Sequence, residues 1–583
     1  MRTHRILTIG PVLLAFLAFA ALAGAQTWSA LNHPSSVPLG TSLLLTDGTV
    51  MSQQMATTGY ATGAWWRLTP DNTGSYLNGT WTQLASMPSG YAPLYYASAV
   101  LPDGRVVVEG GEYNVNSEAE TNLGAIYNPA TNAWTSISPP SGWSEIGDGQ
   151  SVVLANGTFM LGNCCYGSQA LLNESTLTWT PTGANKNDPN SEEGWTLLPS
   201  GEVLTVDTES GTNSELYDPT SGSWSLAGST ISQLPYACPP YVAEVGPAVL
   251  RPEGSVFATG GTSNTAIFTP STGSWSAGPT FPSGYGIDDG PGAVLPDGNV
   301  LVDASPIPVS PCPTYHNGSK FYEFNGTSLT SVSGPPRAGS DASYVARMLV
   351  LPTGQVLFTD GSTSAEIYTA AGTYQSAWQP TITSVASTLT AGTANNVIEG
   401  TQFNGLSQGA AYGDDAQMAT NYPLVRITNN ASGHVVYCKT HNHSTMGVAT
   451  GTATVSTEFD IPSSIGPGAS QLVVVANGIP SKPVSVTIAG ALSCTPTLSC
   501  YAPTEYYLEA SITLSCNQVS QIAVTAEACI NTMGCGSSSN SADASSVSTS
   551  ANDGGLVFSE GGSCPFTWTY GGHNYSETLP AQF

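Results

Sequence analysis

One pattern of apolar and polar residues recurs along the chain: an apolar run, a polar turn that ends in glycine, and a second apolar run. The clearest copy runs from Ala97 to Gly111 and turns at Asp103-Gly104. Asp-Gly, Asn-Gly and Ser-Gly turns supply the positive φ of a tight hairpin, so each copy predicts two adjacent antiparallel strands. There are seven copies, and their turn glycines are Gly48, Gly104, Gly157, Gly201, Gly254, Gly298 and Gly354.

The copies lie 44 to 56 residues apart, which is the length of a kelch-type propeller blade. Several are followed by a third apolar piece and a tryptophan-bearing fourth, as in Ala125–Trp134, Glu215–Trp224 and Ala266–Trp275. One four-stranded blade cannot bury both of its faces, but seven arranged radially can. We therefore predict an all-β chain with a seven-bladed kelch-type β-propeller at residues 26–378. A strand around Trp28 is expected to complete the last blade.

The repeat ends at residue 378, and the pattern changes twice after it. Short alternating strands between Gly, Pro and Asn turns predict an immunoglobulin-like (E-set) β-sandwich at residues 379–489. Residues 490–583 are predicted to be a small Cys-rich, disulfide-stabilised tail, with zinc as the disfavoured alternative because no CxxC pair occurs. Within it, the Ser-rich stretch 537–553 is expected to be a loop. The tail holds six of the chain's 11 cysteines, namely Cys494, Cys500, Cys516, Cys529, Cys535 and Cys564.

The other five cysteines are Cys164, Cys165, Cys238, Cys312 and Cys438. An odd total leaves at least one thiol unpaired unless it bonds to another chain. The adjacent Cys164 and Cys165 could bond to each other or bridge separately. A structural cystine is favoured over a redox site, because disulfides persist outside the cell.

Residues 1–25 are expected to be a secretory signal peptide, because Arg2 and Arg5 precede a short apolar run that ends in small residues. No later stretch is long and apolar enough for a transmembrane segment. The expected location is therefore extracellular or the cell surface. The sequence leaves the oligomeric state open.

The chain is acidic, with 12 Lys+Arg against 40 Asp+Glu and a formal net charge of -28. This negative charge repels the phosphate backbone of nucleic acids, so we expect no nucleic-acid partner.

Acidic and tyrosine residues gather in the loops that lead into the repeated hairpins. Several of these residues lie the same number of positions before their turn glycine. In a radial repeat, such residues would lie at similar depths around the opening at one end of the propeller. Carboxylates beside aromatic rings suit sugar recognition, and carboxylate clusters also bind calcium. The alternative is that they are solvated loop residues of an acidic protein. The predicted ligand-binding residues are Tyr95, Asp148, Glu192, Glu244, Asp288, Asp289, Asp341 and Tyr344.

The signal peptide, the LPDG hairpins and the closing stretch VVVANGIPSKPVSVTI resemble the galactose oxidase and glyoxal oxidase group of secreted copper-radical oxidases. That resemblance implies a copper held by a Tyr-His dipeptide, a second tyrosine cross-linked to a cysteine, and a histidine from a sandwich loop. Tyr344 and Tyr95 match the tyrosines, but Val345 and Gly413 stand where the histidines belong. Valine and glycine side chains offer no donor atom, so we expect a member without the copper ligands.

Other residues could supply donors. Tyr315-His316 recreates the dipeptide at another position, and Cys238 precedes an inner strand, but neither is in the family's place.

His441 and His443 would project from one face of a strand and could hold zinc or copper, with Asp414 or Asp415 approaching from a loop. The favoured alternative is a polar turn whose histidines hydrogen-bond to the backbone.

The function expected from the sequence is non-catalytic binding of a glycan or another extracellular polymer through the propeller mouth. A copper-radical oxidase with rearranged ligands is the alternative from another class, and a structural or adhesive surface protein is a third. No cofactor is assigned: copper is disfavoured, while calcium and zinc stay open.

Overall fold

The computed structural model describes residues 26–237, 243–309, 316–530, 534–554 and 562–582. The regular structure in these ranges consists of β-strands and three short 3₁₀ helices, η1 (Ala338–Ser340), η2 (Ser343–Val345) and η3 (Ser376–Trp378). The chain is therefore all-β, as predicted. The predicted signal peptide, Cys238, Cys312 and Tyr315 lie outside the described residues.

Each of the seven predicted hairpins is present as two antiparallel strands. All seven turn glycines have φ between 75° and 93°, the left-handed conformation that the sequence predicted. The pairs are β2 (Leu39–Leu44) with β3 (Val50–Met55), β7 (Ala97–Val100) with β8 (Val106–Glu109), β13 (Ser151–Val153) with β14 (Phe159–Gly162), β17 (Thr196–Leu197) with β18 (Val203–Val206), β22 (Ala243–Leu250) with β23 (Val256–Gly260), β27 (Gly292–Val294) with β28 (Val300–Pro306), and β31 (Arg347–Val350) with β32 (Val356–Thr359).

Each hairpin belongs to its own sheet and is continued by two outer strands, which follow it in the chain except in the last sheet, where the N-terminal strand β1 is the outermost. The hairpin strands are buried apolar runs such as Val106–Glu109, because both faces of each sheet are covered by neighbouring structure. The fourth strands, such as Ala133–Ile137, are mostly exposed. The outer strands are β4 (Ala61–Thr69), β5 (Thr80–Gln83), β11 (Gly124–Asn128), β12 (Ala133–Ile137), β15 (Gln169–Asn173), β16 (Thr178–Thr182), β19 (Asn213–Asp218), β20 (Ser223–Ser229), β24 (Ala266–Thr269), β25 (Ser274–Ala277), β29 (Lys320–Phe324), β30 (Leu329–Val332), β33 (Ala365–Thr369) and β1 (Thr27–Ala30).

Short strands extend some of these sheets or pair beside them. They are β6 (Pro93–Leu94), β9 (Tyr113–Asn114), β10 (Ser117–Glu118), β21 (Tyr236–Ala237) and β26 (Tyr285–Gly286).

The N-terminal strand β1 completes the last repeat sheet, as expected. Trp28 pairs with Tyr368 on β33, and its indole Nε1 donates a hydrogen bond of 2.6 Å to the Ser333 carbonyl. Its ring centroid lies 5.3 Å from that of Phe321 and 5.5 Å from that of Phe358. The two ends of the repeat region are thus joined by backbone pairing and by aromatic packing.

Residues after the repeats form one continuous nine-stranded sheet around a single apolar core that includes Phe403, Val425 and Leu472. The division of this part into an immunoglobulin-like sandwich, and the exact domain boundaries, stay predictions. Its strands are β34 (Thr381–Val385), β35 (Thr388–Thr390), β36 (Asn396–Thr401), β38 (Leu424–Asn429), β39 (Val435–His441), β40 (Val455–Asp460), β41 (Gly468–Ala476), β42 (Ile479–Pro480) and β43 (Val484–Ala489).

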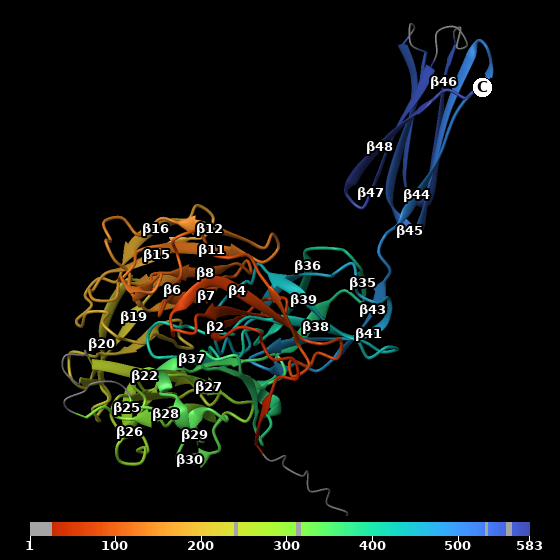
Figure 1. Ribbon diagram of the computed structural model, residues 1–583. Helices are drawn as coiled ribbons and strands as arrows, with labels where there is room; N and C mark the ends of the chain where they lie inside the picture. Colours follow the sequence, from red (N-terminus) through yellow and green to blue (C-terminus); the bar gives the residue numbers. More distant parts are fainter. Residues whose placement is uncertain (1–25, 238–242, 310–315, 531–533, 555–561, 583) are drawn as a thin grey trace, which may run out of the picture.

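The connection between β36 and β38, residues 402–423, extends away from this sheet and in among the repeat sheets; we call it the insertion loop. Its short strand β37 (Ala410–Ala411) pairs with β27, and Figure 1 shows β37 beside β22 and β27. The Gln408 side chain accepts a 2.8 Å hydrogen bond from the Leu197 amide, and the Tyr422 hydroxyl donates to the Leu44 carbonyl. Most of the loop is buried.

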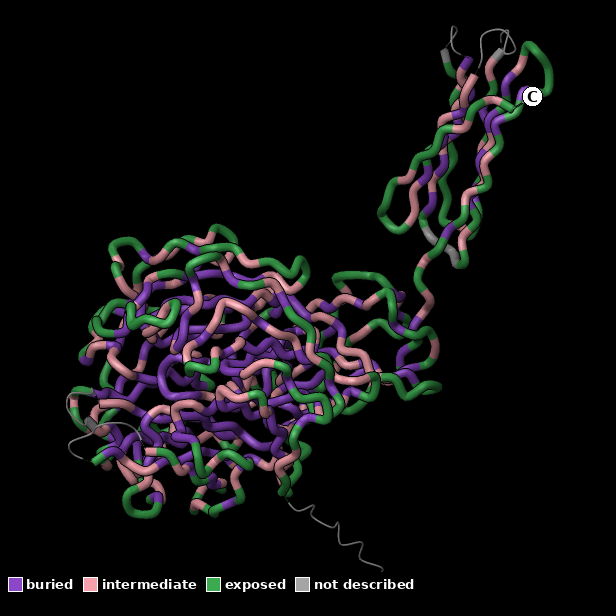
Figure 2. The backbone as a smooth tube through the Cα atoms, in the orientation of Figure 1, coloured by how far each residue is buried: buried purple, intermediate pink, exposed green. Residues whose placement is uncertain are grey.

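The last five strands form a separate, elongated sheet that stands apart from the rest of the chain in Figure 1. Three disulfides cross-link it, Cys494–Cys516, Cys500–Cys564 and Cys529–Cys535, which confirms the predicted disulfide framework and selects its connectivity. Buried and exposed stretches alternate along this sheet in Figure 2. The strands are β44 (Cys494–Thr504), β45 (Tyr507–Ile530), β46 (Gly534–Gly554), β47 (Gly562–Tyr570) and β48 (His573–Pro580).

The expectation of a loop at residues 537–553 was wrong, because these residues belong to β46 and pair with β45 along its length. Alternation explains the difference: Val547 and Ala551 are buried in the sheet's core, while most of the polar residues between them face outward. Pairing with the long strand β45 provides hydrogen-bond partners for the backbone of this segment, although its Ser-rich composition alone predicts a loop.

The remaining cysteines in the described ranges have two fates. Cys164 and Cys165 bond to each other, and Cys438 on β39 is a free, buried thiol. In the same ranges, no helix has the length and apolar composition needed to cross a membrane.

The role of β1 in joining the two ends can be measured. Replacing Trp28 by alanine should lower the free energy of unfolding by about 2–4 kcal/mol, because the ring's packing and its hydrogen bond are both lost. Chemical denaturation provides the measurement, with the exposed neighbour Thr27→Ala as a control expected to change stability by less than about 0.5 kcal/mol. Equal losses in the two variants would contradict the role assigned to Trp28.

Candidate functional site

A cavity of about 290 Å³ lies at the strand ends opposite the turn glycines, where each repeat's entry loop reaches its first strand. Six of the eight predicted ligand-binding residues line it. The lining residues are Tyr95, Glu112, Tyr113, Asp148, Glu192, Glu244, Asp289, Tyr344, Asp414 and Asp415.

A strained backbone presents three of these side chains. Tyr95, Glu192 and Asp289 each lie nine residues before a turn glycine, and their φ values are 52°, 54° and 51°. Non-glycine residues rarely adopt this left-handed conformation, and such strain is concentrated at functional sites. The repeat therefore places the same unusual conformation at equivalent positions of three sheets, with the side chains directed to one cavity.

The insertion loop adds two carboxylates from a different part of the chain. Asp414 and Asp415 are only 2% and 1% exposed, and the Oδ2 atom of each has no hydrogen-bond partner among the described residues. The expectation that one of them approaches His441 was wrong, because the loop carries both between the repeat sheets instead.

Close packing explains the glycine at position 413. A Cβ on Gly413 would lie 2.3 Å from Asp289 Oδ1, and a Cβ on Gly194 would lie 2.2 Å from the Gly413 carbonyl oxygen. No side chain fits there without displacing the neighbouring carboxylate. The position that the family resemblance assigns to a histidine is thus beside the cavity, but it is filled by Asp289.

The carboxylates form two overlapping triads, Asp148–Glu192–Asp414 and Glu192–Glu244–Asp289, in each of which the ligand oxygens lie within 4.8 Å of one another. Burial, followed by repulsion from the neighbouring carboxylates, raises the pKa values of Asp148, Glu192, Asp289 and Asp414 well above the ordinary range. The cavity therefore favours protonated acids or a bound cation over several unneutralised carboxylates.

Arg347 is the buried cation next to this cluster. Its guanidinium lies 3.9 Å from the Tyr412 ring centroid and donates a 2.7 Å hydrogen bond to the Tyr344 carbonyl. The same carbonyl accepts a 2.6 Å bond from the Tyr412 hydroxyl. Burial raises the pKa of Asp415 to about 6, and the Arg347 charge opposes that rise.

Glu112 and Tyr113 line the cavity but were not predicted. They follow the second strand of their hairpin, which ends on the same side as the entry to the first strand. That topology was available from the sequence, so the residues after each second strand could have been considered together with the entry loops. Burial raises the pKa of Glu112 to about 8.

Two predicted residues lie elsewhere. The Asp288 Oδ1 atom lies against Gly261, where an added Cβ would be 2.3 Å away. Asp341 forms an ion pair of 3.1 Å with Arg337. Neither lines the cavity: Asp288 faces the residue that follows β23 in the preceding repeat sheet, and Asp341 faces Arg337.

His441 and His443 have separate partners. His441 ends β39, and Asn442 follows with φ 53°, so the strand alternation that predicted a common face stops there. His441 Nε2 lies 3.0 Å from Asp460 Oδ1, and His443 Nδ1 lies 2.8 Å from the Thr457 hydroxyl. Burial lowers the pKa of His443 to about 3. Metal binding by the pair stays a prediction.

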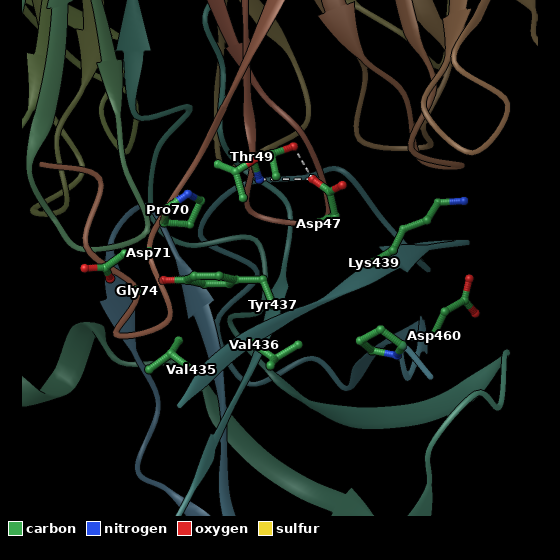
Figure 3. Close-up of a pocket in the computed structure, with 12 residues that line it drawn as sticks. Asp47, Thr49, Pro70, Asp71, Gly74, Val435, Val436, Tyr437, Lys439 and Asp460 are labelled. Atoms are coloured by element: carbon green, nitrogen blue, oxygen red, sulfur yellow. Dashed lines mark hydrogen bonds between the residues drawn. The ribbon is translucent and has the colours of Figure 1, made fainter. Parts of the chain in front are cut away.

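A larger pocket of about 460 Å³ lies between the first hairpin and β39 (Figure 3). Its acidic groups are already bonded: Asp47 Oδ1 accepts hydrogen bonds of 3.0 and 2.6 Å from Thr49, and Asp71 Oδ1 accepts one of 2.8 Å from the Thr73 amide. The Tyr437 ring lies close against the Gly48 turn. This pocket is a structural interface, whereas the acidic cavity has carboxylate oxygens without donors.

No family model matches the chain. The chain is 32% identical over 126 residues to Kelch-like protein terF of Aspergillus terreus, a match that covers 21% of this chain and 26% of that protein. It supports kelch-type repeats.

The solved structures that the chain matches include an oligogalacturonate lyase in complex with manganese, 12% identical with a TM-score of 0.35, and an oligogalacturonate lyase from Vibrio parahaemolyticus, 9% identical with a TM-score of 0.35. Each match covers 59% of this chain and 96% of the other.

Stability should depend on pH in a direction set by the buried acids. Burial raises the pKa of Glu112 from 4.5 to about 8 and that of Asp415 from 3.8 to about 6. The folded state therefore holds these protons more tightly than the unfolded chain, so stability is greatest below about pH 4 and falls as pH rises through 6 to 8. Other buried acids act in the same direction, with pKa values raised to about 7 for Glu120, Asp207 and Glu366 and to about 8 for Asp303.

Thermal unfolding between pH 4 and pH 8 in a chelating buffer tests this dependence. The melting temperature should fall steadily across that range. A melting temperature that rises from pH 4 to pH 8 would show that the buried acids are stabilised as carboxylates.

Proposed function

We propose that the seven repeat sheets are the blades of one kelch-type β-propeller, and that the acidic cavity at its mouth binds a glycan or another extracellular polymer without catalysis. The observation that supports this most is that residues at the entries of six repeat sheets meet the insertion loop at one cavity. Pockets at the mouths of ring-shaped folds are frequent ligand sites.

The cavity has the two chemical features of a sugar site. Tyr95 and Tyr113 lie together with ring centroids 6.2 Å apart, which provides an aromatic surface for the apolar face of a pyranose ring. Carboxylate oxygens without donors, such as Asp415 Oδ2, can accept hydrogens from sugar hydroxyls. A cavity of about 290 Å³ admits one sugar residue of a longer polymer rather than a large ligand.

The competing proposal is a copper-radical oxidase, which the resemblance of the sequence to the galactose oxidase group suggests. Tyr95 and Tyr344, the residues matched to that family's tyrosines, do line one cavity. However, Val345 and Gly413 occupy the histidine positions, and no histidine or cysteine of the described ranges lines the cavity. Copper sites in proteins rely on such nitrogen and sulfur donors, so we favour binding over oxidation.

An extracellular location is part of the proposal. The predicted signal peptide at residues 1–25 and the three disulfides of the C-terminal sheet support it.

Glycan-array binding tests the function. The wild-type chain should bind a defined set of glycans, and Tyr113→Ala should weaken that binding about tenfold by removing part of the aromatic surface. Tyr166→Ala is the matched control, because Tyr166 is 54% exposed and lies outside the cavity. Absence of binding to every glycan and matrix polymer offered would contradict the proposal.

An oxidase assay separates the two functions. Copper-loaded protein supplied with primary alcohols and aldehydes should produce no hydrogen peroxide above a buffer control. Sustained turnover that is lost in Tyr344→Phe would favour the oxidase.

A further inference from the structure

Two buried acidic clusters in this chain differ in how their charge is balanced. The first contains Glu193 and Asp207 and surrounds the ammonium group of Lys186. Lys186 Nζ lies 2.9 Å from Glu193 Oε1 and 2.5 Å from Glu215 Oε2. In this cluster the protein supplies its own cation.

The second cluster is the triad Asp148, Glu192 and Asp414 in the cavity. The salt bridges of the described ranges include none to these three residues. Arg347 is directed elsewhere, because its Nη1 donates to the Tyr344 and Ala346 carbonyls at 2.7 and 2.9 Å. The triad therefore lacks the internal cation that the first cluster has.

Asp414 gives the triad an oxygen that is ready for a ligand. Its Oδ1 atom accepts a 2.7 Å hydrogen bond from the Asp415 amide, which fixes the carboxylate. Among the described residues its Oδ2 atom has no hydrogen-bond donor, although the side chain is only 2% exposed, and the side chain within hydrogen-bonding reach of this carboxylate is Glu192, itself an acid of the triad. Leaving a buried carboxylate oxygen without a donor or a cation is costly. An occupant of the cavity that contacts this oxygen would remove that cost.

We propose that Asp148, Glu192 and Asp414 bind a divalent cation of the calcium class. All three donors are carboxylate oxygens, the ligands that hard cations prefer, and their ligand atoms lie within 4.8 Å of one another, a spacing that one ion can span. The cavity of about 290 Å³ leaves room for water or ligand hydroxyls to complete the six to eight oxygens that calcium takes.

Glu244 and Asp289 form the second triad with Glu192 and lie at the edge of this site. Glu244 and Asp289 would add negative charge near the ion without coordinating it directly. We therefore expect Asp289→Asn to weaken cation binding less than Glu192→Gln does.

This inference deepens the proposed function and rests on it for the role of the ion. A bound cation would offer its open coordination positions to neighbouring hydroxyl or carboxyl groups of a sugar. It would also neutralise a cavity that otherwise repels acidic polymers. Binding of the ion itself requires only the triad, so the two proposals can fail independently.

Calorimetric titration of the full chain with calcium chloride, after treatment with EDTA, tests the site. The wild-type chain should bind calcium, and Glu192→Gln and Asp414→Asn should each weaken binding more than about tenfold because a charged ligand is lost. Glu209→Gln is the matched control: it removes one negative charge at an exposed position outside the cavity and should leave binding unchanged.

Folding of the variants is checked by thermal unfolding without calcium. Glu192→Gln should melt at or above the wild-type temperature, because it relieves repulsion among buried carboxylates, and it should lose the calcium-induced rise of the wild type. Terbium luminescence sensitised by the cavity tyrosines gives a direct readout of ion binding on the wild type alone. Added calcium should displace the terbium ion and reduce this luminescence. Absence of calcium binding, or equal binding by wild type and Glu192→Gln, would overturn the inference.

Glycan binding with calcium and with EDTA separates the two proposals. Calcium binding together with calcium-dependent glycan binding supports both. Calcium binding without any glycan binding supports the cation site and contradicts the proposed function. Glycan binding that is unchanged by EDTA supports the function and contradicts the role given to the ion.

Discussion

The insertion loop is the constraint on which the rest of this structure depends. Residues 402–423 leave the nine-stranded sheet and are buried among the repeat sheets, where Ala410 and Ala411 extend the sheet of β27. A buried irregular segment is tolerated only when its polar groups find partners, and here side chains such as Gln408 and Tyr422 bond to the backbone of two different repeat sheets. The loop thus ties the repeat sheets to the nine-stranded sheet from within.

The two ends of the repeat sheets differ in what they contact: the turn glycines lie at one end, and the insertion loop reaches the cavity at the other. At one end, turn glycines pack against the nine-stranded sheet, as Gly48 does against the Tyr437 ring. At the other end, the loop delivers Asp414 and Asp415 to the cavity. Gly48, Gly104 and Gly354 approach residues of the nine-stranded sheet, whereas the candidate site lies at the opposite strand ends, where the entry loops meet.

The cavity is held in an arrangement that costs stability. Tyr95, Glu192 and Asp289 have left-handed backbones, and the buried carboxylates of Glu192 and Asp289 are repelled by neighbouring carboxylates and form no salt bridge with the described residues. Packing cannot explain this arrangement, because uncharged residues would fill the same space at lower cost. The proposed cation, coordinated by oxygen atoms of several carboxylates, would give these features a common physical reason.

The sequence by itself determined the repeated hairpins, because a Gly turn between two apolar runs is a local signal that needs no distant contact. It also determined the strand at Trp28, the cysteine-rich tail, and six of the ten residues that line the cavity, because equal offsets in a repeat give equal positions. Tertiary structure decided what depended on contacts between distant segments. Asp414 and Asp415 reached the cavity only through the path of the insertion loop, and β46 formed only because β45 offered a partner. Asp288 and Asp289 are neighbours in sequence, yet one faces Gly261 and the other the cavity, because the backbone turns between them through a left-handed residue.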